Sequence, residues 1–265
     1  MYNYGKFTKT IIMTRIKDRR TIRKYKSTPI PESLLNRLLE ESLRTPTMGN
    51  MQLYSVVATT DPKVKAELAP AHFNQPMVMG APVVLTFCAD FNRVTKWCEQ
   101  RDAQPGYDNF LSFINAMSDT LLFTQNFCTL AEEEGLGTCY LGTTVYMPKD
   151  IIRVLRLPRL VFPVATITVG YPDEWPEQND RLPLEGMLHH DVYRDYTPED
   201  IDRIYAYKES LEESRRFVEE NNKKTLAQVF TDVRYTKQDN IFMSGTMVEA
   251  LKMQGFFLLG VKKEV

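Results

Sequence analysis

The sequence has few of the residues that build metal centres and disulfide frameworks. Its 265 residues include four cysteines and three histidines, and no two cysteines form a Cys-x-x-Cys pair. The cysteines lie far apart in apolar or helical contexts, at Cys88, Cys98, Cys128 and Cys139. Neither a metal site nor a disulfide framework is therefore indicated. A reducing, cytoplasmic setting is expected.

A charge excess of one sign, a secretory leader and a long uninterrupted apolar run are also missing. The formal net charge of −1 gives no support for nucleic-acid binding as the main activity. Near the N-terminus, Lys6, Lys9 and Arg15 stand among polar residues without the apolar stretch of a signal peptide. Polar residues such as Asn115 and Asp119 interrupt the longest apolar segment, which excludes a membrane span of about 20 apolar residues. We expect no nucleic-acid or membrane partner.

The chain does have one long amphipathic segment, residues 108–142. Its apolar residues recur with a helical period from Phe110 to Ala131, and further leucines widen the apolar stripe. Little of this helix can face water, which predicts a place in the core or in a subunit interface. Gly135 is a natural C-terminal cap. With Gly137 it would allow the backbone to approach a flat ligand closely, although a core helix followed by an ordinary turn is the alternative.

The order of predicted elements favours an α+β fold over a doubly wound parallel sheet. Strands are expected at Tyr54–Thr59, 81–89 and Val161–Gly170, where Pro163 suggests an edge strand or a strand start. A helix is expected to begin at Thr197 and run to Glu220. Residues 7–16 are expected to be helical, and 256–259 to form a terminal strand. No linker or repeat separates two domains, so residues 1–265 are predicted to form a single domain.

Two polar stretches are candidates for ligand binding. The basic run at residues 18–25 surrounds the hydroxyl of Thr21 with arginines, which suits a phosphate because guanidinium groups bind it bidentately. A charged helix end is the alternative. The loop at residues 45–52 offers the amides of Asn50 and Gln52, which suit the edge of a heterocycle. An ordinary turn would also contain such residues.

Taken together, four stretches resemble the nitroreductase family. They are the basic run 19–25, the loop 45–52, the stretch 135–142, and Gly170-Tyr171-Pro172 with Arg181-Leu182-Pro183. Residues 87–93 and 251–256 are similar to the subgroup of larger NADPH-dependent nitroreductases and flavin reductases. The resemblance covers residues 17–193 as a core and extends loosely over 194–265 as a C-terminal helical arm with a terminal strand.

This resemblance implies an FMN-binding homodimer, with a helix-flanked sheet, a long central helix and a swapped C-terminal arm. Arg19, Thr21 and Arg181 are implied to hold the phosphate, and Arg23 to lie near N1 and the C2 carbonyl of the flavin. The full set of implied FMN-binding residues is Arg19, Arg20, Thr21, Arg23, Pro46, Thr47, Met48, Asn50, Gln52, Gln75, Tyr140, Leu141, Gly142, Thr143 and Arg181. Backbone amides of 140–143 are implied to reach N5 and O4.

The chain departs from the family pattern at several of these positions. Thr21 stands where serine is usual, Leu53 where proline is frequent, and Asn179 where the subgroup often has lysine. Thr143 replaces a usual glycine, which affects how closely the backbone can approach the flavin. These differences predict a substrate site unlike that of the familiar enzymes.

The implied function is an FMN-dependent NAD(P)H oxidoreductase that transfers hydride in ping-pong order to a small electron-poor acceptor such as a nitroaromatic or quinone. The cofactor carries the chemistry, so no side chain is assigned as acid or base. A flavin-binding redox sensor or carrier without nicotinamide turnover is one alternative, and a specialised flavin or enone reductase is another.

Four further residues have open roles. His189 and His190 fit structural or surface positions, and Lys223 and Lys224 are hypothesised to contact the 2′-phosphate of NADPH.

Overall fold

The computed structural model describes residues 16–257, and their contacts form two compact units. Of the described residues, 16–177 and 245–257 belong to the first unit, and Gln178–Ser244 form the second. The predicted core and arm met at residue 194, whereas the second unit begins at Gln178 and the chain's last part belongs with the first. A single domain stays a prediction, and the two units are described separately below.

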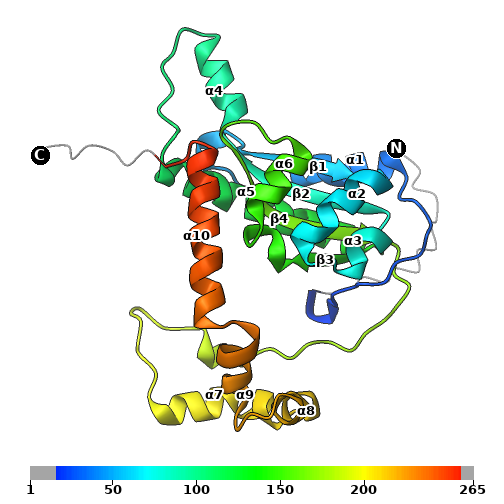
Figure 1. Cartoon of the computed structure of the whole chain (residues 1–265), viewed down its shortest axis with the longest axis vertical. Helices are drawn as coiled ribbons and strands as arrows, with labels where there is room; N and C mark the ends of the chain where they lie inside the picture. The colour runs from blue at the N-terminus through cyan, green and yellow to red at the C-terminus, as the bar shows by residue number, and fades with distance from the viewer. Residues whose placement is uncertain (1–15, 258–265) are drawn as a thin grey trace, which may run out of the picture. The chain divides into compact units, whose positions relative to one another are not determined.

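The first unit contains a four-stranded antiparallel sheet with the order β1-β2-β4-β3 (Figure 1). The strands are β1 (Tyr54–Thr59), β2 (Val83–Asp90), β3 (Gly137–Leu141) and β4 (Val161–Gly170). β2 and β4 are buried along their whole length, as expected for central strands with continuous apolar runs. The α+β fold class is therefore confirmed.

Pro163 does not mark an edge strand, because β4 lies between β2 and β3. The register of β2 on β4 shifts between Phe87, which faces Ala165, and Cys88, which faces Pro163. The irregularity leaves Val164 as an extra residue in β4. A proline, which has no N–H for the ladder, is tolerated in a central strand beside such a bulge.

Helices of the first unit cover both faces of the sheet. They are α1 (Glu32–Ser42), α2 (Pro62–Leu68), α3 (Pro76–Gly80), α4 (Asn92–Glu99), α5 (Phe110–Glu133) and α6 (Pro148–Leu155). Short 3-10 turns are η1 (Ile16–Asp18), η2 (Met48–Asn50), η3 (Ala69–His72) and η4 (Gly142–Val145). On one face, Phe123 and Phe127 of α5 pack against Phe87 of β2. On the other, Val84 packs with Met77 of α3, as the alternation of a strand requires.

The long helix expected around residues 108–134 is confirmed as α5. Phe123 stacks on Tyr54 with ring centroids 4.4 Å apart, so this helix is fixed on β1 as well as β2. Gly135 follows with a φ of +80°, and Leu136 N–H donates to Ala131 O at 2.9 Å. The predicted glycine cap is therefore present.

The second unit is helical. It contains η5 (Leu184–Gly186), α7 (Pro198–Ser210), α8 (Glu212–Glu220), α9 (Leu226–Val229), the π-helix η6 (Phe230–Arg234) and the first part of α10 (Lys237–Met253). One continuous helix to Glu220 is wrong, because Leu211 is extended with a ψ of 141° and separates α7 from α8. Phe256 and Phe257 are not in a strand. Residues 258–259 and the expected helix at 7–15 lie outside the described residues.

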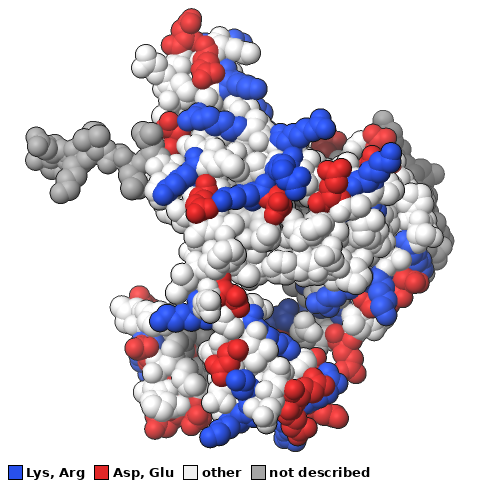
Figure 2. All heavy atoms as spheres, in the orientation of Figure 1, with Lys and Arg blue, Asp and Glu red and all other residues white. Residues whose placement is uncertain are grey.

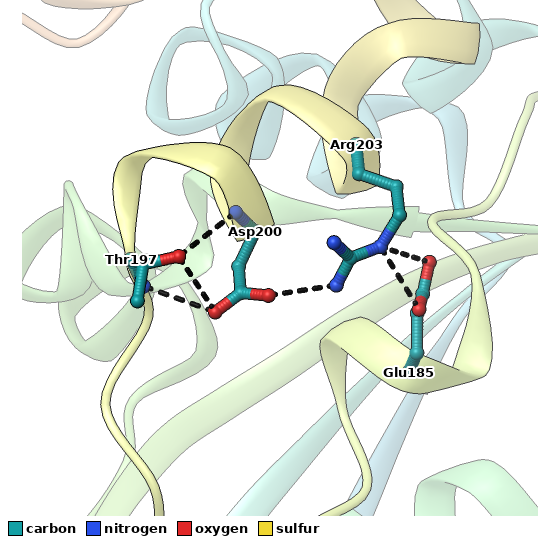
Figure 3. Close-up of polar contacts among 4 residues, drawn as sticks. All are labelled: Glu185, Thr197, Asp200 and Arg203. Atoms are coloured by element: carbon teal, nitrogen blue, oxygen red, sulfur yellow. Dashed lines mark hydrogen bonds and ion pairs between the residues drawn. The ribbon is translucent and has the colours of Figure 1, made fainter.

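The predicted start of α7 is confirmed in detail (Figure 3). Thr197 Oγ1 accepts from the backbone N–H of Asp200 at 3.2 Å, and Asp200 Oδ2 accepts from the N–H of Thr197 at 3.1 Å. Arg203, one turn later, donates to Asp200 at 2.7 Å and pairs with Glu185. Its guanidinium lowers the pKa of the Asp200 carboxyl to about 2, with help from Thr197. This capping box fixes the point at which the segment after η5 becomes α7.

The described surface carries charges of both signs (Figure 2). On the face drawn in Figure 2, basic and acidic side chains are interspersed. Among residues 16–257, no helix is both long and apolar enough to cross a membrane, and no cluster of metal-ligating side chains is found.

Candidate functional site

The amide loop, residues 46–53, has a backbone that the rest of the fold holds in place. Gly49, Asn50 and Gln52 have φ values of 53°, 57° and 54°, a left-handed region that is unfavourable for residues with a Cβ. Asp119 of α5 holds both ends, since Oδ1 accepts from Met48 N–H at 2.9 Å and Oδ2 from Leu53 N–H at 3.3 Å. Asp119 is only 3% exposed, so its carboxylate is committed to this loop.

Arg93, at the start of α4, also contacts this loop. Its guanidinium donates to the backbone carbonyls of Gln52 and Tyr54, while its own N–H donates to the Asp90 carboxylate at 3.2 Å. Pro46, Met48, Asn50 and Gln52 are exposed and Thr47 is half-buried. The predicted contact residues of this loop therefore lie together on a surface that is rigid but open.

The basic run begins at Asp18, the last residue of η1, and its residues 19–25 lie outside any helix. Ile22 N–H donates to Thr138 O of β3 at 3.1 Å, and Lys26 N–H to Tyr171 O at 2.9 Å. The N–H groups of Arg23 and Lys24 both donate to the Glu174 carboxylate, at 2.7 and 3.1 Å. These bonds fix the backbone of the run against β3 and the segment that follows β4.

Glu132 anchors Arg19, a contact that the sequence did not reveal. Arg19 Nε lies 3.1 Å from Glu132 Oε1, which also accepts from the Thr138 hydroxyl at 2.5 Å. Burial raises the pKa of the Glu132 carboxyl, and Thr138 and Arg19 offset only part of this effect. Glu132 thus orients the first predicted phosphate ligand.

Arg20 lies against the Trp175 ring, with its guanidinium carbon 4.8 Å from the ring centroid. Its Nη1 donates to Asp18 O at 2.9 Å, whereas its buried Nε has no protein partner. A cavity of about 130 Å³ adjoins both arginines; its lining includes Asp18, Arg19, Arg20, Glu132, Gly137 and Trp175. The structure therefore brings the basic run and the glycine stretch together.

Gly137 is needed for this packing. A Cβ on Gly137 would lie 2.6 Å from Cβ of Ile22, a distance that real structures do not tolerate. Gly137 also lines the cavity beside the arginines, so the expectation that a ligand approaches its backbone stays a prediction. Gly142 has the opposite surroundings, since a Cβ there would meet nothing within 4 Å.

The structure shows where the side chain of Thr143 lies, at the position where the family usually has glycine. Its side chain is buried, and Oγ1 lies 2.8 Å from Nδ1 of His72, which is fully buried at the end of η3. The threonine therefore occupies the interior rather than the open space beside Gly142. Burial lowers the pKa of His72 to about 4, which keeps its imidazole neutral at neutral pH.

Gln75 lies close to this pair in the chain and in space. Its N–H donates to His72 O at 3.1 Å, and its half-buried side chain precedes α3. Tyr140 packs against the cluster formed by α5 and the sheet, and burial raises its pKa. Packing is thus the observed role of the Tyr140 side chain, while Leu141 is buried and Gly142 lies exposed at the end of β3.

Arg181 belongs to the second unit and is described within it. Its Nη1 donates to the carbonyl oxygens of Asn179 and Asp180, at 3.4 and 2.8 Å. It adjoins a largely apolar cavity of about 640 Å³ whose lining includes Leu182, Ile201, Tyr205 and Phe230. Its assignment as a phosphate ligand stays a prediction.

The sequence did not reveal the residues that hydrogen-bond to the predicted site residues and to the backbone beside them. Asp119 gave one signal, as a lone carboxylate in the apolar stripe of a core helix. His72, Arg93, Glu132 and Glu174 gave none, because their partners lie far away in the chain.

Comparisons with known proteins identify the family of the chain. The sequence profile of the nitroreductase family matches residues 16–171. The FMN reductase [NAD(P)H] of Bacillus subtilis is 30% identical over 204 residues, covering 76% of this chain and 82% of that protein. The oxygen-insensitive NADPH nitroreductase of Salmonella typhimurium is 30% identical over 194 residues, covering 73% and 78%.

A solved structure extends the similarity to the whole fold. A Bacteroides fragilis protein with a provisional assignment as an oxidoreductase is 64% identical, with a TM-score of 0.90 over 91% of this chain and 98% of that one. The profile match and the FMN reductase [NAD(P)H] both cover more than half of this chain. The chain therefore belongs to the nitroreductase family.

Proposed function

We propose that the chain is an FMN-dependent NAD(P)H oxidoreductase that acts on small electron-poor acceptors such as nitroaromatics or quinones. The observation that carries the proposal is the exposed turn at Gly142, where backbone groups face a space that no side chain fills. Bound FMN would supply the hydride transfer, accepting from the nicotinamide and giving to the acceptor in ping-pong order. The names of the two relatives, an FMN reductase and an NADPH nitroreductase, support the same activity.

The residues present fit an FMN. Arg19, Arg20 and Arg23 give one stretch three cations, and the buried Nε of Arg20 has no protein partner. Arg19 and Thr21 would bind the phosphate, and Arg23 would place positive charge beside N1 and the C2 carbonyl. The amide loop would hold Asn50 and Gln52 ready for the edge of the ring, because Asp119 and Arg93 fix its backbone.

Nicotinamide turnover separates the proposal from a flavin carrier or sensor. The purified holoprotein is expected to lose its flavin absorbance when NADPH or NADH is added without oxygen, and to regain it when a quinone or nitroaromatic follows. A yellow protein whose absorbance stays constant with both nicotinamides would be a carrier. Transfer to free FMN or to an enone, with none to quinones, would identify the specialised reductase.

Removing the Arg19 side chain is expected to weaken FMN binding about tenfold or more. A charge-assisted hydrogen bond contributes about 1.5–3 kcal/mol, which Arg19→Ala would remove from the phosphate. The measurement is the dissociation constant of FMN by fluorescence titration. Arg37→Ala is the control. Arg37 lies on α1, outside the basic run, and like Arg19 it pairs with glutamates, here Glu41 and Glu134. Equal FMN affinity in both variants would remove Arg19 from the site.

The surface of α5 supports a homodimer. From Phe110 to Ala131 the helix has a single charged residue, Asp119, and that residue is buried. Its exposed face includes Leu111 and Leu122, which are 68% and 49% exposed. An uncharged helix face of this length is typical of a subunit interface. A flavin site shared between two subunits would also give the open amide loop a partner surface.

Charge on this face is expected to dissociate the dimer. Sedimentation at micromolar concentration should show a dimer for the wild type and a monomer for Leu111→Glu/Leu122→Glu, because burying two unpaired carboxylates is unfavourable. Lys63→Glu on α2 is the control for the added charge. A monomeric wild type with bound FMN would contradict the dimer.

The contacts of Lys223 and Lys224 in the second unit differ, which bears on the hypothesis that both bind the 2′-phosphate of NADPH. Lys223 Nζ is paired with Asp232 at 3.0 Å, and Arg216 lies near Glu213 and Glu220. Lys224 and Arg215 instead line a cavity of about 330 Å³, together with Glu209 and Glu219. Lys224 is therefore better placed than Lys223 to contact a 2′-phosphate.

The wild type is expected to prefer NADPH over NADH about tenfold in kcat/KM, as a partly screened charge contact would give. Lys224→Ala should reduce this ratio about fivefold, and Lys223→Ala, the matched control, should change it little. Equal efficiency with both nicotinamides in the wild type would contradict the preference. An unchanged ratio in Lys224→Ala would exclude that lysine from the contact.

A cytoplasmic location is part of the proposal. It is supported by the four cysteines, all of them described and all free thiols.

A further inference from the structure

The inference starts from two turns that lie next to each other at the proposed flavin site. The first turn, residues 72–75, follows η3, and the second, residues 141–146, follows β3. His72 Nδ1 and Thr143 Oγ1 join them at 2.8 Å, and the Phe73 and Tyr146 rings stack with centroids 6.4 Å apart. We propose that His72 is a positioning residue of the flavin site, which holds the open turn at Gly142 in register with the turn that carries Gln75. This inference rests on the proposed function.

The first turn transmits the position of His72 directly to Gln75. Phe73 and Asn74 both have a φ of 53°, so the chain reverses within two left-handed residues. Asn74 N–H donates to Ala69 O at 2.8 Å, and Gln75 N–H to His72 O at 3.1 Å. A shift of His72 would therefore move the backbone of Gln75 with it.

The second turn transmits the position of Thr143 to Gly142. Thr143 O accepts from Tyr146 N–H at 3.0 Å, and the Thr144 hydroxyl donates to Leu141 O at 2.9 Å. These hydrogen bonds fix the backbone of the turn at residues 141–146. The Thr143 hydroxyl is the group by which this unit binds to His72.

The surroundings of His72 suit positioning rather than proton transfer. Its ring is fully buried, and Nε2 has no protein partner. The imidazole stays neutral because burial disfavours its charged form, so the bond to Thr143 keeps the same character across neutral pH. A glycine at position 143, as the family usually has, could not make this bond. His72 thus accounts for the departure at Thr143.

Matched substitutions of the holoprotein test the bond. Thr143→Val and His72→Leu remove it with little change of volume. Thr143→Ser keeps the hydroxyl, and His72→Asn keeps an amide nitrogen near the position of Nδ1. The readouts are the dissociation constant of FMN and the midpoint potential of bound FMN. Thr143→Val and His72→Leu are expected to weaken FMN about tenfold and to shift the potential, since one buried hydrogen bond is lost. The two conservative variants are expected to stay within about threefold of wild type.

The double variant and a control separate positioning from general destabilisation. His72→Leu/Thr143→Val should bind FMN no more weakly than either single variant, because both remove one interaction. Thr86→Val is the control; Thr86 is a buried hydroxyl in the sheet, 3.5 Å from that of Thr166. It should lower thermal stability without changing FMN affinity or potential.

Two results with the variants overturn the inference. Wild-type affinity and potential in Thr143→Val would show that the bond only packs the fold, and so would an equal loss of affinity in Thr86→Val. Either result leaves the proposed function intact if NADPH still reduces the wild-type flavin. A wild type that binds no FMN overturns both.

Discussion

Replacing Asp119 by asparagine is expected to lower the free energy of unfolding by about 3 kcal/mol, a large effect for a change that conserves shape. The carboxylate accepts from Met48 N–H and Leu53 N–H, and it is buried on α5. An asparagine has one acceptor oxygen, so its amide NH₂ would face one of these backbone donors. Leaving a buried donor unpaired costs about 1–3 kcal/mol, and the charge-assisted bond is lost as well.

Denaturant unfolding of the apo protein measures this effect without depending on the flavin. Ser118→Ala is the control; Ser118 precedes Asp119 on α5, but its exposed hydroxyl only bonds Ile114 O, at 2.9 Å. Its replacement is expected to change stability by less than about 0.5 kcal/mol. An equally small change in Asp119→Asn would show that the amide loop is not held by this carboxylate.

The same variant also tests the amide loop as a flavin contact. Once one end is released, the left-handed residues Asn50 and Gln52 should relax to more favourable backbone angles. FMN affinity should then fall together with stability. Reduced stability with unchanged FMN affinity would show that the loop is well held but lies away from the cofactor.

Local patterns predicted the elements of the first unit well. The continuous apolar runs gave β2 and β4, and the helical period gave α5 with its cap at Gly135. These features depend on residues close together in the chain, so they can be predicted from a single sequence. Pro163 lies near the start of β4, but the edge position that it also suggested is wrong. A bulge that accommodates proline in a central strand is a property of strand pairing, which a local pattern does not contain.

Long-range contacts account for what the sequence could not give. Glycine at 137 and glycine at 142 are identical in the sequence, yet Ile22 packs on the first and nothing fills the space beside the second. The sequence predicts that the cations Arg19 and Lys223 can bind a phosphate. In the structure, Arg19 is paired with Glu132 and Lys223 with Asp232. The chemistry of a site residue is thus visible in the sequence, while its partner depends on the fold.

The pH dependence of stability should report the burial of His72. Its pKa is about 4 in the folded protein, against an ordinary value of 6.5. Between these values the unfolded state binds more protons than the folded state, so stability rises with pH. The contribution is complete above about pH 6.5, is lost as the pH falls to about 4, and changes no further below that. A pKa difference of this size corresponds to about 3 kcal/mol.

Comparing wild type with His72→Asn isolates this contribution from the carboxylates, which titrate in both proteins. The difference in their free energies of unfolding should favour the wild type by about 3 kcal/mol more at pH 7 than at pH 4. Thr143→Val is the control, because it leaves the imidazole buried, and burial is the cause of the lowered pKa. Its curve should therefore run parallel to that of the wild type. If the His72→Asn curve also ran parallel to that of the wild type, the pKa of His72 would be the same in the folded protein as in the unfolded chain.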